Sequence, residues 1–377
     1  MRKLPGTARV TLVAHPDALA EAELIAAAAA GDIEIMTTPS YLNFSVWAED
    51  ACLVVEDDGA EEPLTYLVEP FSFSRYGDQV VVDLVAQASE AVASTQLPLS
   101  FQGGNVLVGD DVLVGRDYLD ETITLGLEGQ TPIVHFPTQG PPEEMERFGA
   151  ELFARSLDPS RQFHFLASSP SARPADGPVR RGEEVWWNRV TGGWGRRQPI
   201  FHIDMFVSLA GRLAPGSPYR VLVGDPSAAD EIMGWAAVPH ELQSEFDEIA
   251  AQLDGLGFEV HRAPLPVIDA AYRFPVPQPV QLSDGTSLEI AGEIEWYHAT
   301  SNNCLVQIVG DAREVWLPTY GQEAAPDLAP IDARHRELWE GLGFVVHQLS
   351  DFHHLARASG ALHCIKKYLA RGPATGS

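Results

Sequence analysis

The sequence predicts an α/β fold built from repeated helix-to-strand units. The clearest repeat joins "DGLGFEVHRAPLP" at 254–266 and "EGLGFVVHQLSDF" at 340–352. In both, a polar helical segment precedes Gly-Leu-Gly-Phe and a strand that ends in a short loop; these helical segments are "ELQSEFDEIAAQL" at 241–253 and "ARHRELWE" at 333–340. This recurrence favours one pseudo-symmetric domain over residues 1–377 rather than independent modules.

Other segments fit the same α/β reading. The alanine-rich stretch from Asp17 to Ala30 predicts a helix that Asp17 caps and Gly31 ends. Short β-branched runs predict strands: "IEIM" (33–36), "ACLVVED" (51–57), "NVLVG" (105–109), "DVLVG" (111–115) and "RVLVG" (220–224). The Pro-, Ser- and Gly-rich segment "SSPSARPADGPVRRGEE" at 168–184 predicts an exposed loop.

The charge of the chain restricts its partners. It carries 53 Asp and Glu against 25 Lys and Arg, a formal net charge of -28. Such a surface repels phosphate backbones and anionic lipids, so we expect neither nucleic acid nor membranes as partners. The same field would attract cationic ligands, including guanidinium and ammonium compounds. An acidic surface that serves only solubility is the alternative explanation.

The cysteines indicate a reducing compartment. Three cysteines, at positions 52, 304 and 364, cannot form a disulfide framework, and their spacing fits no zinc ribbon or finger. The apolar run "VTLVA" near the N-terminus is too short for a convincing signal peptide or a membrane span. We therefore expect a cytoplasmic protein.

Three short motifs contain residues suited to chemistry. In "PIFHIDMFVSLAG" (199–211), His202 and Asp204 would leave the same face of a strand, where one moves protons and the other fixes a cation. In "SVWAEDACLVV" (45–55), a carboxylate beside Trp47 suits a cationic head on an aliphatic stem. The paired glycines of "LSFQGGNVLVG" (99–109) lack phosphate-loop spacing and indicate a tight turn. Each motif taken alone is more often structural.

Cys364, in "SGALHCIKKY" near the C-terminus, is the fourth candidate. A thiol becomes a useful nucleophile only when a neighbouring positive charge or a base favours its thiolate. His202 or a bound guanidinium could supply this. Without such a partner, a lone cysteine is more often structural.

The order of these motifs resembles that of the guanidine-modifying enzymes, the pentein superfamily. Trp47-x-x-Asp50, Gly-Gly-Asn at 103–105, His202-x-Asp204 and a C-terminal Cys364 follow one another as they do there. The resemblance covers about residues 40–370 and is closest to the catalytic domain of peptidylarginine deiminases, with agmatine deiminase-like features in "TSNNCLVQIVGDAREVWLPTYG" and "HCIKKY". It implies a pseudo-fivefold α/β propeller formed by a single catalytic domain.

The resemblance also implies roles for individual residues. Cys364 is the nucleophile, His202 is the general acid and base, and Asp50 and Asp204 grip the guanidinium. The implied substrate-binding residues are Trp47, Gly104, Asn105 and Asn303. The implied reaction converts arginine, peptidyl or free, or a related guanidino compound, to a ureido product and ammonia through a thiouronium on the cysteine. No cofactor or metal is implied.

Several positions depart from the relatives. Ala51 and Leu53 stand where the calcium-dependent animal enzymes have acidic metal ligands, so calcium dependence is not expected. Glu49 and Gln102 replace the Arg and Glu of agmatine deiminases, which weakens the case for free agmatine. Two alternatives stay open: an amidinotransferase that passes the amidino group to an amine, and a binding scaffold without catalysis.

Overall fold

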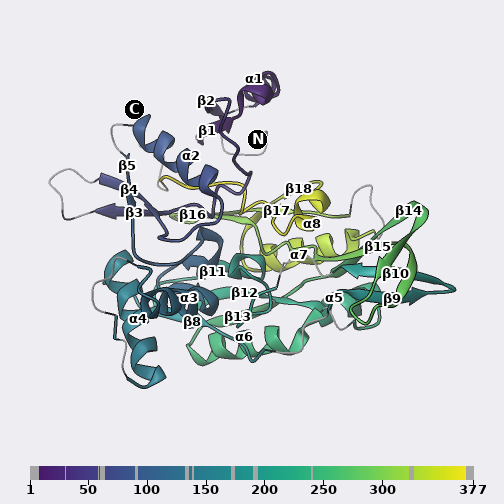
Figure 1. Cartoon of the computed structure of the whole chain (residues 1–377). Coiled ribbons are helices and arrows are strands. Elements are labelled where there is room, and N and C mark those ends of the chain that lie inside the picture. The colour runs from purple at the N-terminus through teal and green to yellow at the C-terminus, as the bar shows by residue number, and fades with distance from the viewer. Residues whose placement is uncertain are drawn as a thin grey trace. The chain divides into compact units, whose positions relative to one another are not determined.

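Figure 1 shows the ribbon of the computed structural model. The chain forms two compact units. Unit 1 comprises Met1–Gly103, Thr131–Val134 and Ile365–Ser377, and unit 2 comprises Gly104–Gln130 and His135–Cys364. The structure describes residues 8–370 apart from 30, 58, 60–63, 90–91, 132–135, 138–139, 171–174, 190–193, 239–240 and 322–326.

Four three-stranded sheets in the described part of the chain share one topology. In each, the first strand pairs antiparallel with the second, and the second pairs parallel with the third after a helical crossover. The repeat in unit 1 is β3 (Leu53–Asp57), β4 (Leu64–Glu69), α2 (Tyr76–Gln87) and β5 (Val92–Gln96). The first repeat of unit 2 is β6 (Val106–Val108), β7 (Val112–Gly115), α3 (Arg116–Leu127), α4 (Pro142–Leu157) and β8 (Phe163–Leu166).

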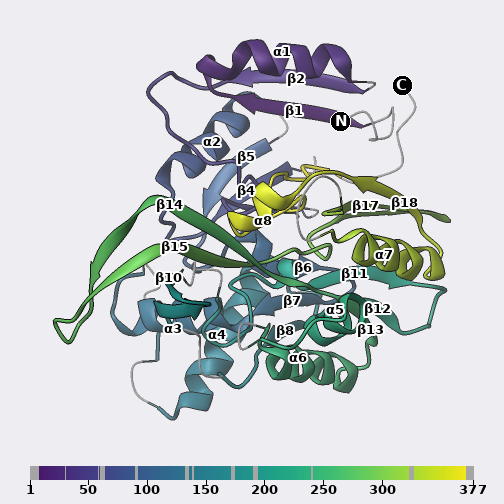
Figure 2. The ribbon, with the colours of Figure 1, turned by 90° about the vertical axis from the view of Figure 1, so that its right-hand side faces the viewer.

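Two further repeats complete this set in unit 2. One is β11 (Val207–Arg212), β12 (Tyr219–Asp225), α5 (Pro226–Met233), α6 (Gln243–Gly255) and β13 (Glu259–Pro264). The other is β16 (Leu305–Val309), β17 (Ala312–Pro318), α7 (Ala329–Gly341) and β18 (Val345–Leu349). Figure 2 shows α6 and α7 each lying along the sheet of its own repeat.

The Gly-Leu-Gly-Phe motif is the link between the helix and the last strand of these two repeats. Gly257 and Gly343 have φ of 90° and 87°, a left-handed conformation that glycine adopts without steric cost. The following N–H groups, of Phe258 and Phe344, bond back to carbonyls five residues earlier at 3.1 and 3.0 Å, which ends each helix in a Schellman motif. The predicted repeat of helix and strand is therefore confirmed.

A hydrophobic core joins the sheets of these two repeats. Both large aromatic side chains at its centre, Trp339 and Phe344, are buried and meet edge to face at 4.8 Å between ring centroids. The other members of the cluster are Ala210, Leu222, Ala263, Cys304, Val315, Leu317 and Leu342. Their burial supplies the apolar area that holds the two sheets together.

The N-terminal part of unit 1 is a βαβ element. β1 (Arg9–Ala14) and β2 (Asp32–Thr37) pair in parallel, and α1 (Leu19–Ala28) connects them. The prediction that Asp17 caps this helix is wrong. Pro16 begins a 3-10 turn, and the His15 ring accepts the Asp17 N–H at 3.2 Å, so Asp17 lies inside the first turn. The helix was expected to reach Ala30, but it ends at Ala28, because Ala29 is already extended.

A four-stranded sheet in unit 2 stands apart from the repeats. Its order is β14 (Val267–Gln281), β15 (Ser287–His298), β10 (Glu184–Arg189) and β9 (Gly177–Arg181). β14 and β15 form a long hairpin that extends away from the three repeats of unit 2 (Figure 2). The segment 168–184, expected as an exposed loop, includes strand β9, which pairs with β10. Residues 171–174 of that segment lie outside the described residues.

The mixed α/β class is confirmed. The closed pseudo-fivefold propeller and the single catalytic domain stay predictions. None of the helices in the described ranges combines the length and apolarity that a membrane crossing needs.

The buried His335 of α7 makes folding stability depend on pH. Its Nε2 donates to the carbonyl of Pro264 at 2.7 Å, and burial lowers the pKa of the imidazole to about 4. The unfolded chain then binds the extra proton between pH 6.5 and 4, so stability is complete above pH 6.5 and falls toward pH 4.

We expect His335→Gln to remove this dependence, because the glutamine amide can replace the Nε2 donor without titrating. Urea unfolding at pH 7 and pH 5 should show a loss for the wild type that exceeds the loss for the variant by about 2 kcal/mol. Equal losses in the two proteins would contradict the assignment of a neutral buried imidazole.

Candidate active site

Four of the predicted site residues occupy the same topological position, each in a different repeat. Each lies just before the first strand of its repeat: Asp50 before β3, Asn105 before β6, Asp204 before β11 and Asn303 before β16. Cys364 follows the last repeat and the short helix α8 (His353–Arg357). Six of the predicted residues fall in unit 2, namely Gly104, Asn105, His202, Asp204, Asn303 and Cys364, and Trp47 and Asp50 fall in unit 1.

His202 and Asp204 do not lie on a strand, as the alternation of polar and apolar residues predicted. They belong to a 3-10 turn, Ile203–Met205, with His202 as its N-cap residue. The prediction fails because all residues from His202 to Phe206 are buried, so the burial does not alternate as it does on a strand. The main-chain N–H of Ile203 bonds to the Asn105 side chain rather than to a neighbouring strand.

Two buried amides hold the segment that carries His202. The Asn105 Oδ1 accepts the Ile203 N–H and the Gln198 Nε2, each at 2.9 Å. Gln198 also donates to the carbonyls of Ile200 and Phe201, each at 3.0 Å. Asn105 thus fixes the segment that carries His202. Its role in substrate binding stays a prediction. Nothing in the local sequence marks Gln198, which the motif spacing missed.

Gly104 brings the main chain against the side chains of His202 and Asp204. A Cβ at this position would lie 2.7 Å from His202 Nδ1 and 3.0 Å from Asp204 Oδ2. Real Cβ atoms do not approach other atoms this closely, so only glycine fits without displacing the imidazole or the carboxylate. The second glycine of the pair is therefore part of the site's shape rather than only of a turn.

The loop that carries Cys364 is fixed by the side chain of Asn303. Its Oδ1 accepts the main-chain N–H groups of Ala361, His363 and Cys364 at 3.1, 2.9 and 3.2 Å. Its Nδ2 donates to the Cys364 sulfur at 3.1 Å. One buried amide therefore sets the position of both the main chain and the thiol.

Asp204 is the carboxylate of the assembled site. Its side chain is 2% exposed, and its Oδ2 lies 3.7 Å from the Cys364 sulfur. Oδ2 also bonds to Nδ1 of His363 at 2.8 Å. Oδ1 is buried and has no hydrogen-bond donor among the described residues. A buried carboxylate oxygen normally has a donor, so Oδ1 is the position at which a cationic ligand would be accommodated.

His202 is the second polar group beside Gly104. Its ring is fully buried, packs against Phe201 at 4.1 Å between centroids, and lies with Nε2 3.4 Å from the Tyr118 hydroxyl. The imidazole is therefore confined on more than one side. A confined imidazole that lines the same glycine as a carboxylate is a suitable proton donor and acceptor.

Asp50 of unit 1 already binds a guanidinium, that of Arg75. The Arg75 Nη2 donates to Asp50 Oδ2 at 2.6 Å, and its Nε donates to Asp78 Oδ2 at 2.8 Å. Asp78 also accepts the main-chain N–H and hydroxyl of Ser45, whose Oγ accepts the Trp47 N–H at 3.2 Å. This network fixes the turn from Ser45 to Asp50, and the half-buried Trp47 lies on it. The motif reading did not single out Arg75.

Glu49, next to Asp50, pairs with both lysines that follow the nucleophile. Lys366 and Lys367 donate to its two oxygens at 2.6 and 2.9 Å. All three side chains are largely buried, and breaking such a pair leaves an uncompensated buried charge. Glu49, which departs from the agmatine deiminase pattern, is thus paired with two cations, Lys366 and Lys367.

The other two cysteines occupy structural positions. Burial raises the pKa of the Cys52 thiol to about 11, so it stays protonated and unreactive at neutral pH. Cys304 lies in the core between the two repeats, 3.9 Å from the Ser208 hydroxyl. In the described ranges no cluster of three or more His, Cys, Asp or Glu is placed to hold a metal ion.

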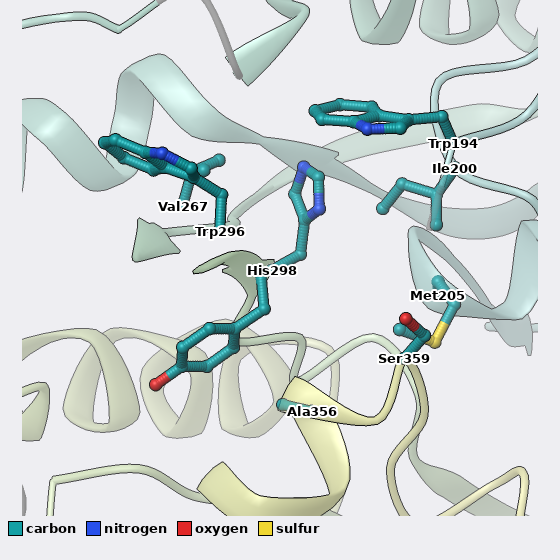
Figure 3. A pocket seen from close by; sticks show the side chains of 9 residues that line it. Trp194, Ile200, Met205, Val267, Trp296, His298, Ala356 and Ser359 are labelled. Atoms are coloured by element: carbon teal, nitrogen blue, oxygen red, sulfur yellow. The ribbon is translucent and has the colours of Figure 1, made fainter. Parts of the chain in front are cut away.

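A small cavity in unit 2 adjoins the segments that carry the site. The indoles of Trp194 and Trp296 and the His298 ring border it, with Met205 and Ser359 on another side (Figure 3). The volume of the cavity is ≈ 20 Å³, counted as the space that the centre of a water molecule can occupy. One water molecule needs roughly 10–15 Å³ on this measure, so the cavity is too small for a guanidino compound.

The fold is shared with solved structures of guanidine-modifying enzymes. The agmatine deiminase of Enterococcus faecalis matches with a TM-score of 0.53 and 15% identity, over 94% of this chain and 81% of that one. A C. jejuni agmatine deiminase matches at 0.50 and 12%, over 95% and 80%. A candidate peptidyl-arginine deiminase matches at 0.51 and 13%, over 95% and 84%. No family model and no curated protein matches the sequence.

These matches confirm the mixed α/β class, and the chain shares the fold of these solved agmatine and peptidyl-arginine deiminase structures. The closed pseudo-fivefold propeller stays a prediction. At these identities the likeness concerns the fold alone, and the chemistry is argued from the site.

Gly104→Ala tests the close approach at the site. The added methyl would displace His202 or Asp204, and a displacement of about 1 Å at reacting groups costs on the order of 100-fold in rate. We expect that loss in kcat/KM for a guanidino substrate, accompanied by a loss of stability of about 1–3 kcal/mol, because the added methyl overpacks a buried site.

Gly255→Ala, at the end of α6, is the matched control, because a Cβ there meets no atom within 4 Å. It should keep full activity. A Gly104→Ala enzyme as active as the control would show that the space beside His202 is not required.

Proposed function

We propose that the protein is a deiminase that hydrolyses a guanidinium group to a ureido group and ammonia. The observation that carries the proposal is the placement of the Cys364 sulfur, 3.1 Å from Asn303 Nδ2 and 3.7 Å from Asp204 Oδ2. The buried Oδ1 of Asp204, which lacks a donor among the described residues, suits a cationic N–H group. A thiol beside an acceptor for a planar cation is the arrangement that attack on a guanidinium carbon requires.

The substrate guanidinium binds to carboxylates in this proposal. Asp204 accepts one of its N–H groups through Oδ1, and we assign the same role to Asp50 from the resemblance. Charge-assisted hydrogen bonds of this kind hold the planar group in a fixed orientation. The hydrogen bond that Asp50 accepts from the Arg75 guanidinium supports the assignment, because it is the kind of bond proposed for the substrate. Trp47 would pack on the methylene stem of the substrate.

Cys364 then attacks the guanidinium carbon. The thiol proton passes to His202, a carbon–sulfur bond forms, and the tetrahedral adduct breaks its carbon–nitrogen bond as His202 protonates the departing ammonia. A thiouronium on Cys364 remains. His202 next takes a proton from water, whose oxygen bonds to the same carbon. The carbon–sulfur bond breaks, which releases the ureido product and restores the thiol.

The substrate class is arginine, in a peptide or free, or a small guanidine on an aliphatic stem. The structures that share the fold are named for agmatine and for peptidyl arginine, both of which carry such a group. The chain's net charge of -28 supports a cationic substrate.

Replacement of the nucleophile tests the proposal. Wild-type enzyme should release ammonia and a ureido compound from at least one of agmatine, free arginine and an arginine peptide. Cys364→Ala and Cys364→Ser should each lower the rate by about 1,000-fold or more, because covalent catalysis is lost while the fold is retained.

Cys52→Ala is the control, since it removes a thiol whose high pKa makes it unreactive at neutral pH, and it should keep near wild-type activity. Unchanged activity in the Cys364 variants would refute the proposal. Adding glycine as an acceptor distinguishes hydrolysis from amidino transfer: a guanidino product in place of the ureido compound would indicate a transferase.

A further inference from the structure

His363 contacts the site but has no role in the chemistry proposed above. Its Nδ1 lies 2.8 Å from Asp204 Oδ2, and its side chain is largely buried, with 14% exposed. An ionised carboxylate can only accept hydrogen bonds, so Nδ1 carries the proton and donates. The imidazole therefore binds the same carboxylate that the guanidinium is proposed to use.

The main chain of His363 is fixed independently of its side chain. Its N–H donates to Asn303 Oδ1 at 2.9 Å and lies 3.2 Å from the Asn303 carbonyl oxygen. Because Asn303 also fixes Cys364, the nucleophile and the imidazole are held by one residue. The His363 ring thus extends from a main chain that is held in place. It can therefore hold the Asp204 side chain in a fixed position.

The hydrogen bond from His363 gives the two Asp204 oxygens different surroundings. Oδ2 is engaged by His363 and lies close to the Cys364 sulfur. Oδ1 is buried and has no donor in the described part of the chain. A carboxylate that is held at one oxygen cannot rotate freely, so the position of Oδ1 is set by the bond at Oδ2.

We propose that His363 is a positioning residue for substrate binding: it holds Asp204 by Oδ2 so that Oδ1 accepts an N–H of the substrate guanidinium. This inference rests on the proposed function for the identity of the substrate. It gives His363 no part in bond making or breaking. Loss of the imidazole should therefore weaken guanidinium binding much more than it slows the chemical steps.

Two variants separate the donor from the rest of the ring. His363→Ala removes the donor, whereas in His363→Asn the side-chain amide nitrogen lies near the place of Nδ1 and can still donate. His261→Ala is the control, because His261 makes a comparable pair with Glu259 on β13, exposed and outside the site.

Binding is measured by calorimetry with 1-butylguanidine in the Cys364→Ala background, where no reaction occurs. His363→Ala should raise the Kd about 10- to 100-fold, the loss expected for a hydrogen bond that orients a charged group, and His363→Asn should stay within about threefold of the parent. The His261 variant should not differ from the parent.

Kinetics with Cys364 present provide the second measurement. In His363→Ala the KM should rise by a similar factor while kcat changes by less than about threefold. A fall in kcat at constant KM would overturn the inference and indicate proton transfer by His363. An unchanged Kd in His363→Ala, or an equal loss in the Asn and Ala variants, would also overturn it.

The binding measurement keeps this inference distinct from the proposed function. If the wild type makes no ureido product but the Kd values follow the predicted order, the proposed function fails and the positioning role of His363 stands. If ureido product forms and the Kd values do not follow that order, the positioning role fails alone.

Discussion

The burial of Asp204 is the constraint on which the proposed active site depends. A carboxylate that is 2% exposed must be compensated by donors, and the protein supplies only some of them. His363 donates to one oxygen, and the Cys364 thiol lies near that same oxygen. Gly104 has no side chain, so the main chain comes close to the carboxylate without displacing it. The other oxygen has no donor among the residues that the structure describes, and a cationic ligand would supply one.

The repeat gives four of the predicted site residues equivalent positions in the chain topology. Asp50, Asn105, Asp204 and Asn303 each come directly before the first strand of a repeat, the same topological position each time. The repeats have diverged in what they place there. Two present carboxylates, and two present buried amides that fix the His202 segment and the Cys364 loop. The carboxylates that we propose for substrate binding and the amides that fix the main chain thus stand at equivalent positions of the repeats.

The repeated helix and strand were predictable from the sequence because Gly257 and Gly343 need a left-handed conformation that marks the end of each helix. The order of Asp50, His202, Asp204 and Cys364 could also be recognised in the sequence, because each role in the proposed reaction restricts the residue type at its position. The 3-10 turn at His202 was not predictable, because a distant amide, Asn105, takes the N–H that a strand partner would otherwise bond. His363 and Arg75 were missed for the same reason: their partners, Asp204 and Asp50, are distant in the chain.

The central claim is that Cys364 forms a bond to the guanidinium carbon during turnover. Mass spectrometry of acid-quenched turnover mixtures tests it directly, first on the intact protein and then on its proteolytic peptides. The account predicts an adduct with the mass of the substrate minus ammonia, on the peptide that contains Cys364. The same adduct on the peptide of Cys52 or Cys304, or turnover in which Cys364 stays unmodified at every quench time, would contradict it.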